Sequence, residues 1–223
     1  MIISDNITQY LHSLEQDRSA RLEEMRAFAE QENVPIIRRE AESFLQVLLC
    51  LLHAESVLEI GTGIAYSAIF MAECSSDLKK IVTIENYPPR IKIAKENLER
   101  FRKEEAEKAD IELIEEDAVK AVEKIQGPFD LIFLDGPKAQ YLSMLPDLLG
   151  LLRKGGILLA DNVLQDGELV RSRYVTQRRD RTIHERMREF LYEVKHHPDL
   201  ITSIVTVGDG MSVSLKKEDE GNE

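Results

Sequence analysis

The chain has 223 residues and a formal net charge of −12; 43% of its residues are hydrophobic and 31% are charged. This composition is typical of a globular domain, and the acidic balance argues against a surface that coats phosphates throughout. No apolar run reaches the roughly 18 residues that a membrane span needs. The N-terminus lacks the basic start of a signal peptide, and the two cysteines have no zinc or disulfide spacing. We therefore expect a cytoplasmic protein that does not contact membranes.

Short aliphatic runs alternate with segments of helical spacing after residue 53. Strand, helix and strand in succession form parallel sheets with right-handed crossovers, so the alternation predicts an α/β, doubly wound, Rossmann-like sheet. We expect Gly155-Gly156 to end a helix just before the fifth strand. The first five strands are predicted at 57–60, 80–85, 111–117, 129–135 and 156–163.

The last two predicted strands form a hairpin. Residues 201–207 and 211–215 are separated only by Gly208-Asp209-Gly210, and glycines allow the positive φ angles of a tight turn. One late strand should therefore run antiparallel, which gives a seven-stranded, mostly parallel sheet that closes with an antiparallel hairpin.

The two ends of the chain lack the strand-helix alternation of its middle. Residues 5–53 predict two or three amphipathic helices, with a break at Pro35, and residues 217–223 are polar and are expected to be disordered. A chain of this length folds by default around one core. The predicted organisation is one domain over 1–216, with N-terminal helices over 1–53 and the Rossmann-like core over 54–216, followed by the tail.

The loop after the first strand suggests a cofactor site. In residues 59–67, EIGTGIAYS, glycines let the backbone approach a ligand, and a helix begins whose free N–H groups can bind it. A dinucleotide fingerprint would place a third glycine where Tyr66 stands, which argues against NAD, although a plain tight turn remains an alternative. Glu85 ends the second strand, where a carboxylate can bind both ribose hydroxyls, and Asp117-Ala118 fall where an adenine would lie. S-adenosylmethionine fits this pattern better than a dinucleotide does.

Two further strands end in hard oxygen ligands. Asp135 closes the fourth strand and Asp161-Asn162 close the fifth, so their side chains should meet at one sheet edge. Two carboxylates and an amide suit Mg²⁺ or another hard divalent cation, although each could be a turn former or helix cap. Lys138 follows closely. Beside a metal and a sulfonium its pKa should fall, so it could act as a general base, although most loop lysines are simply solvated.

These stretches together resemble the metal-dependent class I S-adenosylmethionine O-methyltransferases of the catechol and caffeoyl-coenzyme A type. They are VLEIGTGIAYSAIFMA (57–72), IVTIE (81–85), FDLIFLDGPKAQY (129–141) and ILLADNVL (157–164). The resemblance implies that Asp135, Asp161 and Asn162 bind Mg²⁺ and that Lys138 and Asp135 are catalytic. The cofactor-binding residues that it implies are Ile37, Glu59, Gly61, Ser67, Glu85, Asp117, Ala118 and Asp135.

A narrower resemblance is to the bacterial tRNA 5-hydroxyuridine methyltransferases, a branch that converts a wobble 5-hydroxyuridine to 5-methoxyuridine. It is carried by ENVPII (32–37), ADNVLQDGELV (160–170), RRDR (178–181) and HHPDLITSIVTVGDGMSVS (196–214). The resemblance implies a tRNA substrate and a homodimer. A catechol and a 5-hydroxyuracil each present two adjacent oxygens that one cation could bind.

A local basic segment fits the tRNA interpretation. Residues 171–188 hold seven arginines against two acids, a local charge of +5, which leaves −17 for the rest of the chain. This arginine island could bind anticodon phosphates, although a charged helix start is the simpler alternative. The candidate RNA-contacting residues are Arg171, Arg173, Arg178, Arg179 and Arg181.

Three other functions remain open from the sequence. The same chemistry could act on a small catechol-like phenol, which would predict activity without RNA. An NAD-dependent oxidoreductase is disfavoured by Tyr66 and by the antiparallel hairpin, and NADH binding would revive it. A non-catalytic binding module is disfavoured because every acid, amide and lysine position is intact.

Overall fold

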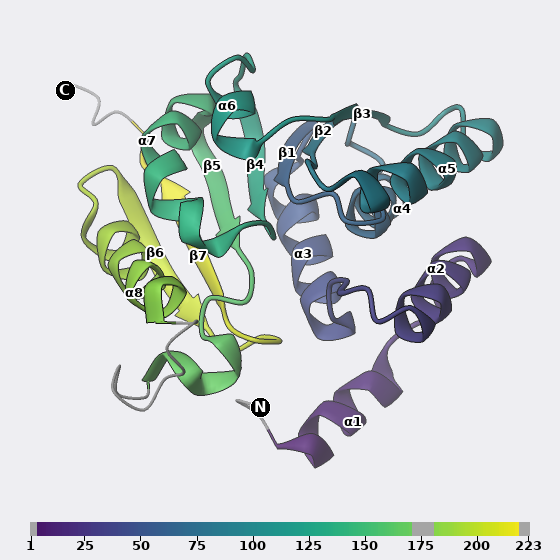
Figure 1. The fold of residues 1–223 in the computed structure, drawn as a ribbon, viewed down its shortest axis with the longest axis horizontal. Helices are drawn as coiled ribbons and strands as arrows, with labels where there is room; N and C mark the ends of the chain where they lie inside the picture. Colours follow the sequence, from purple (N-terminus) through teal and green to yellow (C-terminus); the bar gives the residue numbers. More distant parts are fainter. Residues whose placement is uncertain (1–3, 171–180, 219–223) are drawn as a thin grey trace.

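A seven-stranded sheet, in the order β3-β2-β1-β4-β5-β7-β6, runs through the computed structural model, which describes residues 4–170 and 181–218 (Figure 1). β7 runs antiparallel to both of its neighbours, β5 and β6, and the pairs among β1 to β5 are parallel. The strands are β1 (Ser56–Ile60), β2 (Lys80–Ile84), β3 (Asp110–Ile114), β4 (Phe129–Leu134), β5 (Leu152–Ala160), β6 (Leu200–Val205) and β7 (Met211–Lys216). The helices are α1 (Asp5–Leu14), α2 (Ala20–Gln31), α3 (Arg39–Leu52), α4 (Tyr66–Cys74), α5 (Pro88–Glu104), α6 (Ala118–Val122), α7 (Tyr141–Leu151) and α8 (Arg181–His196), with short 3₁₀ turns η1 (Lys138–Gln140) and η2 (Gln165–Val170).

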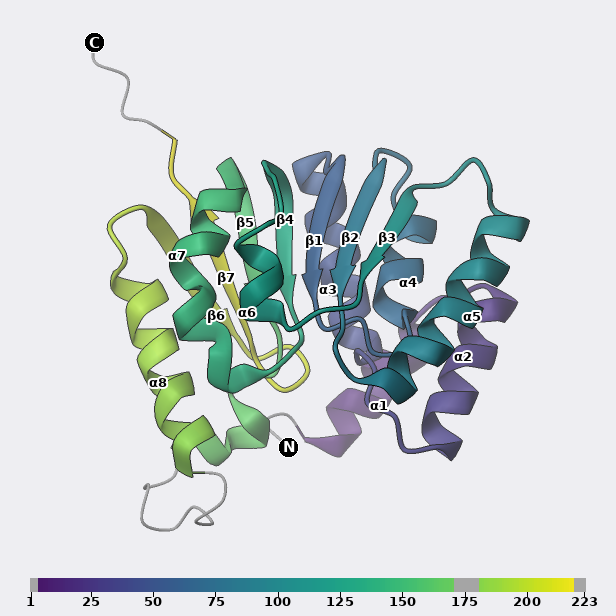
Figure 2. The ribbon, with the colours of Figure 1, turned by 45° about the horizontal axis from the view of Figure 1, so that its top comes forward.

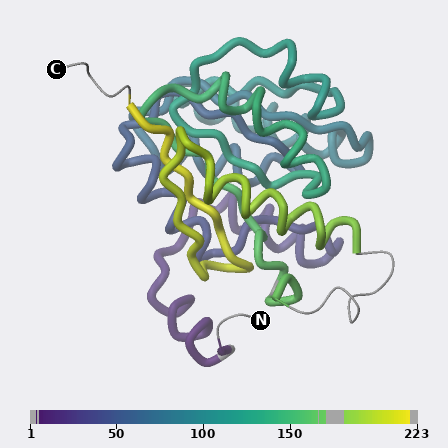
Figure 3. Tube along the Cα trace, turned by 90° about the vertical axis from the view of Figure 1, so that its left-hand side faces the viewer, coloured from purple at the N-terminus to yellow at the C-terminus, as the bar shows by residue number. Residues whose placement is uncertain are grey.

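Helices cover both faces of this sheet (Figure 2). Successive strand residues point to opposite faces, so Val57 of β1 joins the core beneath α3, α4 and α5, whereas Leu58 joins the core beneath α6, α7 and α8. Both residues are fully buried, as expected for a parallel strand that is covered on two sides. The predicted doubly wound sheet with its antiparallel hairpin is confirmed, and Figure 3 shows the hairpin running beside α8.

The predicted role of Gly155-Gly156 is wrong. Helix α7 already ends at Leu151, and β5 begins at Leu152, so both glycines lie inside the strand. The pairing of β5 with β4 shifts register after Leu152, and Gly155 has a φ of 68° at this irregularity. A Cβ on Gly156 would lie 2.8 Å from the carbonyl oxygen of Asp130. The two glycines therefore permit a bulge and a close backbone approach instead of capping a helix.

The N-terminal segment forms three helices, in agreement with the prediction, and Pro35 lies in the connection between α2 and α3. Helix α1 lies at the edge of the molecule in Figures 1 and 3, and one side of it exposes Ile7, Tyr10 and Leu14. The homodimer stays a prediction, which the mass of the protein in solution would decide. In the part of the chain that the structure describes, no helix is long and apolar enough to cross a membrane.

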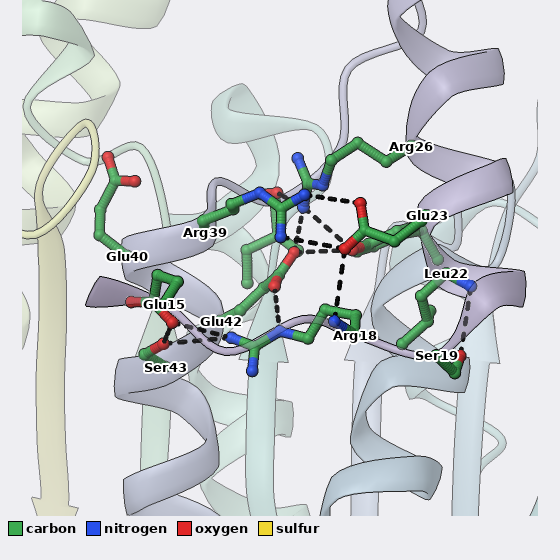
Figure 4. A network of polar contacts seen from close by, with 12 residues as sticks. Glu15, Arg18, Ser19, Leu22, Glu23, Arg26, Arg39, Glu40, Glu42 and Ser43 are labelled. Atoms are coloured by element: carbon green, nitrogen blue, oxygen red, sulfur yellow. Dashed lines mark hydrogen bonds and ion pairs between the residues drawn. The ribbon is translucent and has the colours of Figure 1, made fainter. Parts of the chain in front are cut away.

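A buried ionic network joins the N-terminal helices to the sheet domain (Figure 4). Its centre is Glu42 of α3, which is fully buried and accepts hydrogen bonds from Arg18, at 3.0 Å, and from Arg26 of α2. The hydroxyl of Tyr66, at the start of α4, donates to the same carboxylate at 2.9 Å. Arg26 also donates to the carbonyl of Ile37 at 3.2 Å. One carboxylate thus fixes three helices and the segment that follows Pro35.

Replacing this carboxylate should destabilise the fold. We expect Glu42→Gln to lower the free energy of unfolding by about 3 kcal/mol, because Arg18 and Arg26 would lose a buried counter-charge. Urea unfolding followed by circular dichroism measures the change. Glu30→Gln, at an exposed position of α2, is the matched control and should change stability by less than about 0.5 kcal/mol. Equal effects of the two variants would contradict a structural role for the network.

Candidate active site

A cavity of about 440 Å³ lies beyond the carboxyl ends of the parallel strands. The strand order reverses between β1 and β4, and ligands in doubly wound sheets bind at such a reversal. Of the residues that the sequence singles out, eight line the cavity: Ile37, Gly61, Ser67, Glu85, Ala118, Asp135, Lys138 and Asn162. Glu59, Asp117 and Asp161 do not line it.

Two loops meet at the floor of the cavity. Gly61 follows β1 with a φ of 105°, and a Cβ there would lie only 2.4 Å from the carbonyl oxygen of Asp135, which follows β4. Gly136 is constrained by space, because a Cβ there would lie 2.9 Å from the carbonyl oxygen of Ile60. Glycine is therefore required at position 61 both by backbone conformation and by space.

The Glu85 carboxylate is held in a fixed orientation at one end of the cavity. It follows β2 and is 8% exposed. One oxygen accepts the backbone N–H groups of Asn86 and Tyr87, at 3.0 and 2.9 Å, and the other accepts that of Gly63 at 3.0 Å. Each carboxylate oxygen can accept further hydrogen bonds, so the group can bind the hydroxyls of a ribose. Ala118, the first residue of α6, lines the cavity as well.

Glu59 lies behind the cavity wall. Its side chain is fully buried, and its two oxygens accept hydrogen bonds from the hydroxyls of Ser67 and Thr83, each at 2.5 Å. Burial raises the pKa of this carboxyl group to about 7, although both hydroxyls oppose the change. Ser67 lines the cavity, so Glu59 reaches it through a hydrogen bond.

Two of the three predicted metal ligands, Asp135 and Asn162, line the same cavity, and Asp161 directly precedes Asn162 in the chain. Asp135 and Asp161 directly follow the neighbouring strands β4 and β5, and Asn162 adopts a φ of 58°, a left-handed conformation that asparagine tolerates. Desolvation raises the pKa of both carboxyl groups, and for Asp135 the negative charges of Asp161 and Glu59 raise it further. Lys138 opposes both shifts.

This set of oxygens fits a hard divalent cation. A cation between two buried carboxyl groups stabilises their ionised forms. An adjacent amide adds a neutral oxygen ligand. Within residues 4–170 and 181–218, no group of three or more His, Cys, Asp and Glu side chains is placed to hold a metal. A cation at this position would therefore take two carboxylates and one amide from the chain, with other oxygens completing its coordination.

Several cavity residues escaped the sequence analysis. Gln140 ends the turn η1 two residues after Lys138, and Tyr87 and Arg90 belong to the start of α5. The prolines at 88 and 89 mark this helix start and could have directed attention to its neighbours. No local pattern distinguishes Gln140.

The arginine island falls largely outside the described residues. Arg171, Arg173, Arg178 and Arg179 lie in the range 171–180, which the structure does not describe. Arg181 is the first residue of α8 and is partly exposed. The phosphate-binding role of the island stays a prediction.

The raised pKa of Glu59 predicts a pH-dependent stability. Between pH 4.5 and about 7 the unfolded chain ionises this residue while the folded chain holds it protonated, so the unfolded state gains stability as the pH rises. We expect Glu59→Gln, compared with the wild type, to be about equally stable at pH 4.5 and more stable by up to about 3 kcal/mol at pH 8. Urea unfolding without ligands measures the difference. Glu123→Gln, at an exposed position, should leave the pH profile unchanged, and a similar effect of both variants would contradict the assignment.

Comparisons with known proteins agree with this geometry. The model of the O-methyltransferase family matches residues 12–217. A catechol O-methyltransferase of Mycobacterium tuberculosis is 31% identical over 179 residues, which cover 77% of this chain and 76% of that protein. A catechol O-methyltransferase of Niastella koreensis is 34% identical over 135 residues, 57% of this chain and 58% of the relative's length.

Solved structures show the same similarity. A Staphylococcus aureus protein, provisionally described as a caffeoyl-CoA O-methyltransferase, superposes with a TM-score of 0.86 at 30% identity, over 95% of this chain and all of that one. An O-methyltransferase from Bacillus cereus, in complex with SAH, superposes with a TM-score of 0.80 at 25% identity, over 95% of this chain and 97% of that one. The chain therefore belongs to the O-methyltransferase family and is an enzyme of that class.

Proposed function

We propose that the enzyme transfers a methyl group from S-adenosylmethionine to a hydroxyl that lies beside a second oxygen on the acceptor, with the help of a divalent cation. One observation carries the proposal: Glu85, the predicted ribose ligand, lines the same cavity as Asp135, Lys138 and Asn162. A methyl donor and a metal-bound acceptor would therefore lie next to each other, and positioning of this kind supplies much of a methyl transferase's acceleration.

The cofactor would occupy the end of the cavity near β1 and β2. S-adenosylmethionine, when bound, supplies an electrophilic methyl group. Glu85 would accept the ribose hydroxyls with the oxygens that its three backbone donors leave accessible. Gly61 would let the methionine part lie against the backbone, and Ala118 would contact the adenine. The solved B. cereus relative with SAH supports a cofactor of this kind.

The cation would be held by Asp135, Asp161 and Asn162. A bound Mg²⁺ supplies positive charge that lowers the pKa of the acceptor hydroxyl and favours two adjacent oxygens over one. Lys138 would accept the hydroxyl proton on its amine, and Asp135 would orient the acceptor. Because Asp135 lines the cavity from the floor shared with Gly61, it connects the two halves of the site.

We propose a wobble 5-hydroxyuridine of tRNA as the acceptor. Its O5 and O4 form the adjacent oxygen pair, and the arginine island offers charge for anticodon phosphates. A small catechol is the second candidate, because both curated relatives named above are described as catechol O-methyltransferases. The two candidates share every residue of the metal site and differ in their need for RNA.

Substrate and metal are tested together with total tRNA from cells that lack this protein. Purified enzyme, Mg²⁺ and methyl-labelled S-adenosylmethionine should place label in 5-methoxyuridine, as identified by mass spectrometry, and EDTA should abolish it. Asp161→Ala should lower this activity by at least about a hundredfold, since a metal ligand is lost. Asp147→Ala, an exposed acid of α7, is the matched control. Label in a catechol but not in RNA would overturn the tRNA proposal and keep the metal site.

The role of Lys138 as base predicts that charge alone cannot replace it. We expect Lys138→Arg and Lys138→Met to lower kcat by roughly a hundredfold or more. A guanidinium stays protonated and a thioether is not basic, so neither side chain can accept the hydroxyl proton. Calorimetry should show S-adenosylmethionine binding unchanged. Lys120→Met, at an exposed position of α6, should leave kcat unchanged. Full activity of Lys138→Arg would show that the residue acts as a charge and not as a base.

A further inference from the structure

Gln140 carries an unsatisfied acceptor on the wall of the active-site cavity. Its side-chain oxygen Oε1 is buried from solvent and has no hydrogen-bond partner among residues 4–170 and 181–218, although the residue lines the same cavity as Asp135, Lys138 and Asn162. A buried acceptor without a partner costs about 1–3 kcal/mol, so such groups are rare in folded proteins. At a cavity wall the missing donor can come from a ligand.

The backbone around Gln140 is firmly held, so this unpartnered oxygen does not belong to a frayed turn. The Gln140 N–H donates to the carbonyl of Pro137 at 2.8 Å, and its own carbonyl accepts the Ser143 hydroxyl at 2.8 Å. Helix α8 braces the same turn, because Arg186 donates to the carbonyl of Ala139 at 2.9 Å. The amide is therefore presented from an ordered position, which recognition of one ligand edge requires.

The position of Gln140 in the same turn as Lys138 suggests what it could contact. Lys138 and Gln140 belong to one three-residue turn, so a ring whose hydroxyl faces Lys138 brings its neighbouring atoms toward Gln140. In 5-hydroxyuracil the order around the ring is O5, O4, N3–H and O2. With O5 and O4 facing the metal ligands, the next group is the N3–H donor.

We propose that Gln140 is the specificity-determining residue that distinguishes a uracil from a catechol, by accepting the N3–H of the ring with Oε1. The amide nitrogen of the same side chain offers a donor to O2, so the carboxamide pairs with the imide edge as it pairs with bases elsewhere. A catechol has only C–H groups at these positions and leaves the acceptor unsatisfied. This inference rests on the proposed tRNA function and adds a residue that recognises its base.

The test compares two anticodon stem-loop RNAs that differ by one methyl group. One carries 5-hydroxyuridine at the wobble position, and the other carries 3-methyl-5-hydroxyuridine, which has no N3–H. For the wild type we expect kcat/KM to be roughly ten- to a hundredfold lower on the second RNA, the range that corresponds to an unpaired buried acceptor. Gln140→Leu keeps the side-chain volume and removes the acceptor, so its preference should fall by at least about fivefold. Gln126→Leu, an exposed glutamine, should keep the wild-type preference.

The outcomes separate this inference from the proposed function. If the wild type methylates neither RNA, the tRNA proposal fails, and the role of Gln140 fails with it. If the wild type methylates 5-hydroxyuridine and Gln140→Leu keeps the full preference between the two RNAs, the tRNA proposal holds and the role of Gln140 is overturned. Equal loss on both RNAs would also overturn it, because the side chain would then act on something other than N3.

Discussion

The close approach of two backbone loops at the floor of the cavity is the constraint on which the site depends. Gly61 and Gly136 let the loops after β1 and β4 touch, with spacings that no side chain at either position would allow. This contact brings Asp135, which directly follows β4, beside the loop that follows β1, and both line the cavity. Parallel strands alone would place both loops at one edge of the sheet. The two glycines allow the loops to approach closely enough to line one cavity.

The same packing concentrates negative charge, which the fold must tolerate. Burial is the largest cause of the raised pKa of Asp135, Asp161 and Glu59, and the negative charges of Asp161 and Glu59 raise the pKa of Asp135 further. Such a cluster lowers the stability of the chain by itself. It is well matched to the two cationic ligands of the proposed reaction, a sulfonium and a divalent metal ion, because each offsets charge that the protein has already desolvated.

The sequence predicted the parts of the molecule that follow from periodicity and strand ends. The alternation of strands with helices led to the sheet, and the acids that end two of the predicted strands led to Glu85 and Asp135. The start of β5 could not be found this way, because Leu152 continues the apolar spacing of α7 and only pairing with Phe129 makes it a strand. Glu42 and Gln140 escaped for the same reason. The burial of the Glu42 carboxylate and the missing partner of the Gln140 amide oxygen depend on tertiary structure, and the neighbouring residues in the sequence do not indicate them.

The charge of the whole chain limits how an RNA could reach this site. With a net charge of −17 outside residues 171–188, the chain as a whole repels a polyanion, and the arginine island is a locally basic segment that would attract one. Phosphate contacts from that segment would orient the RNA without reading its sequence, since every nucleotide carries the same charge. Discrimination of the base must then come from neutral groups in the cavity. The amide oxygen of Gln140, on a residue that lines the same cavity as Asp135, is suited to this task, because it accepts an N–H without adding to the negative charge.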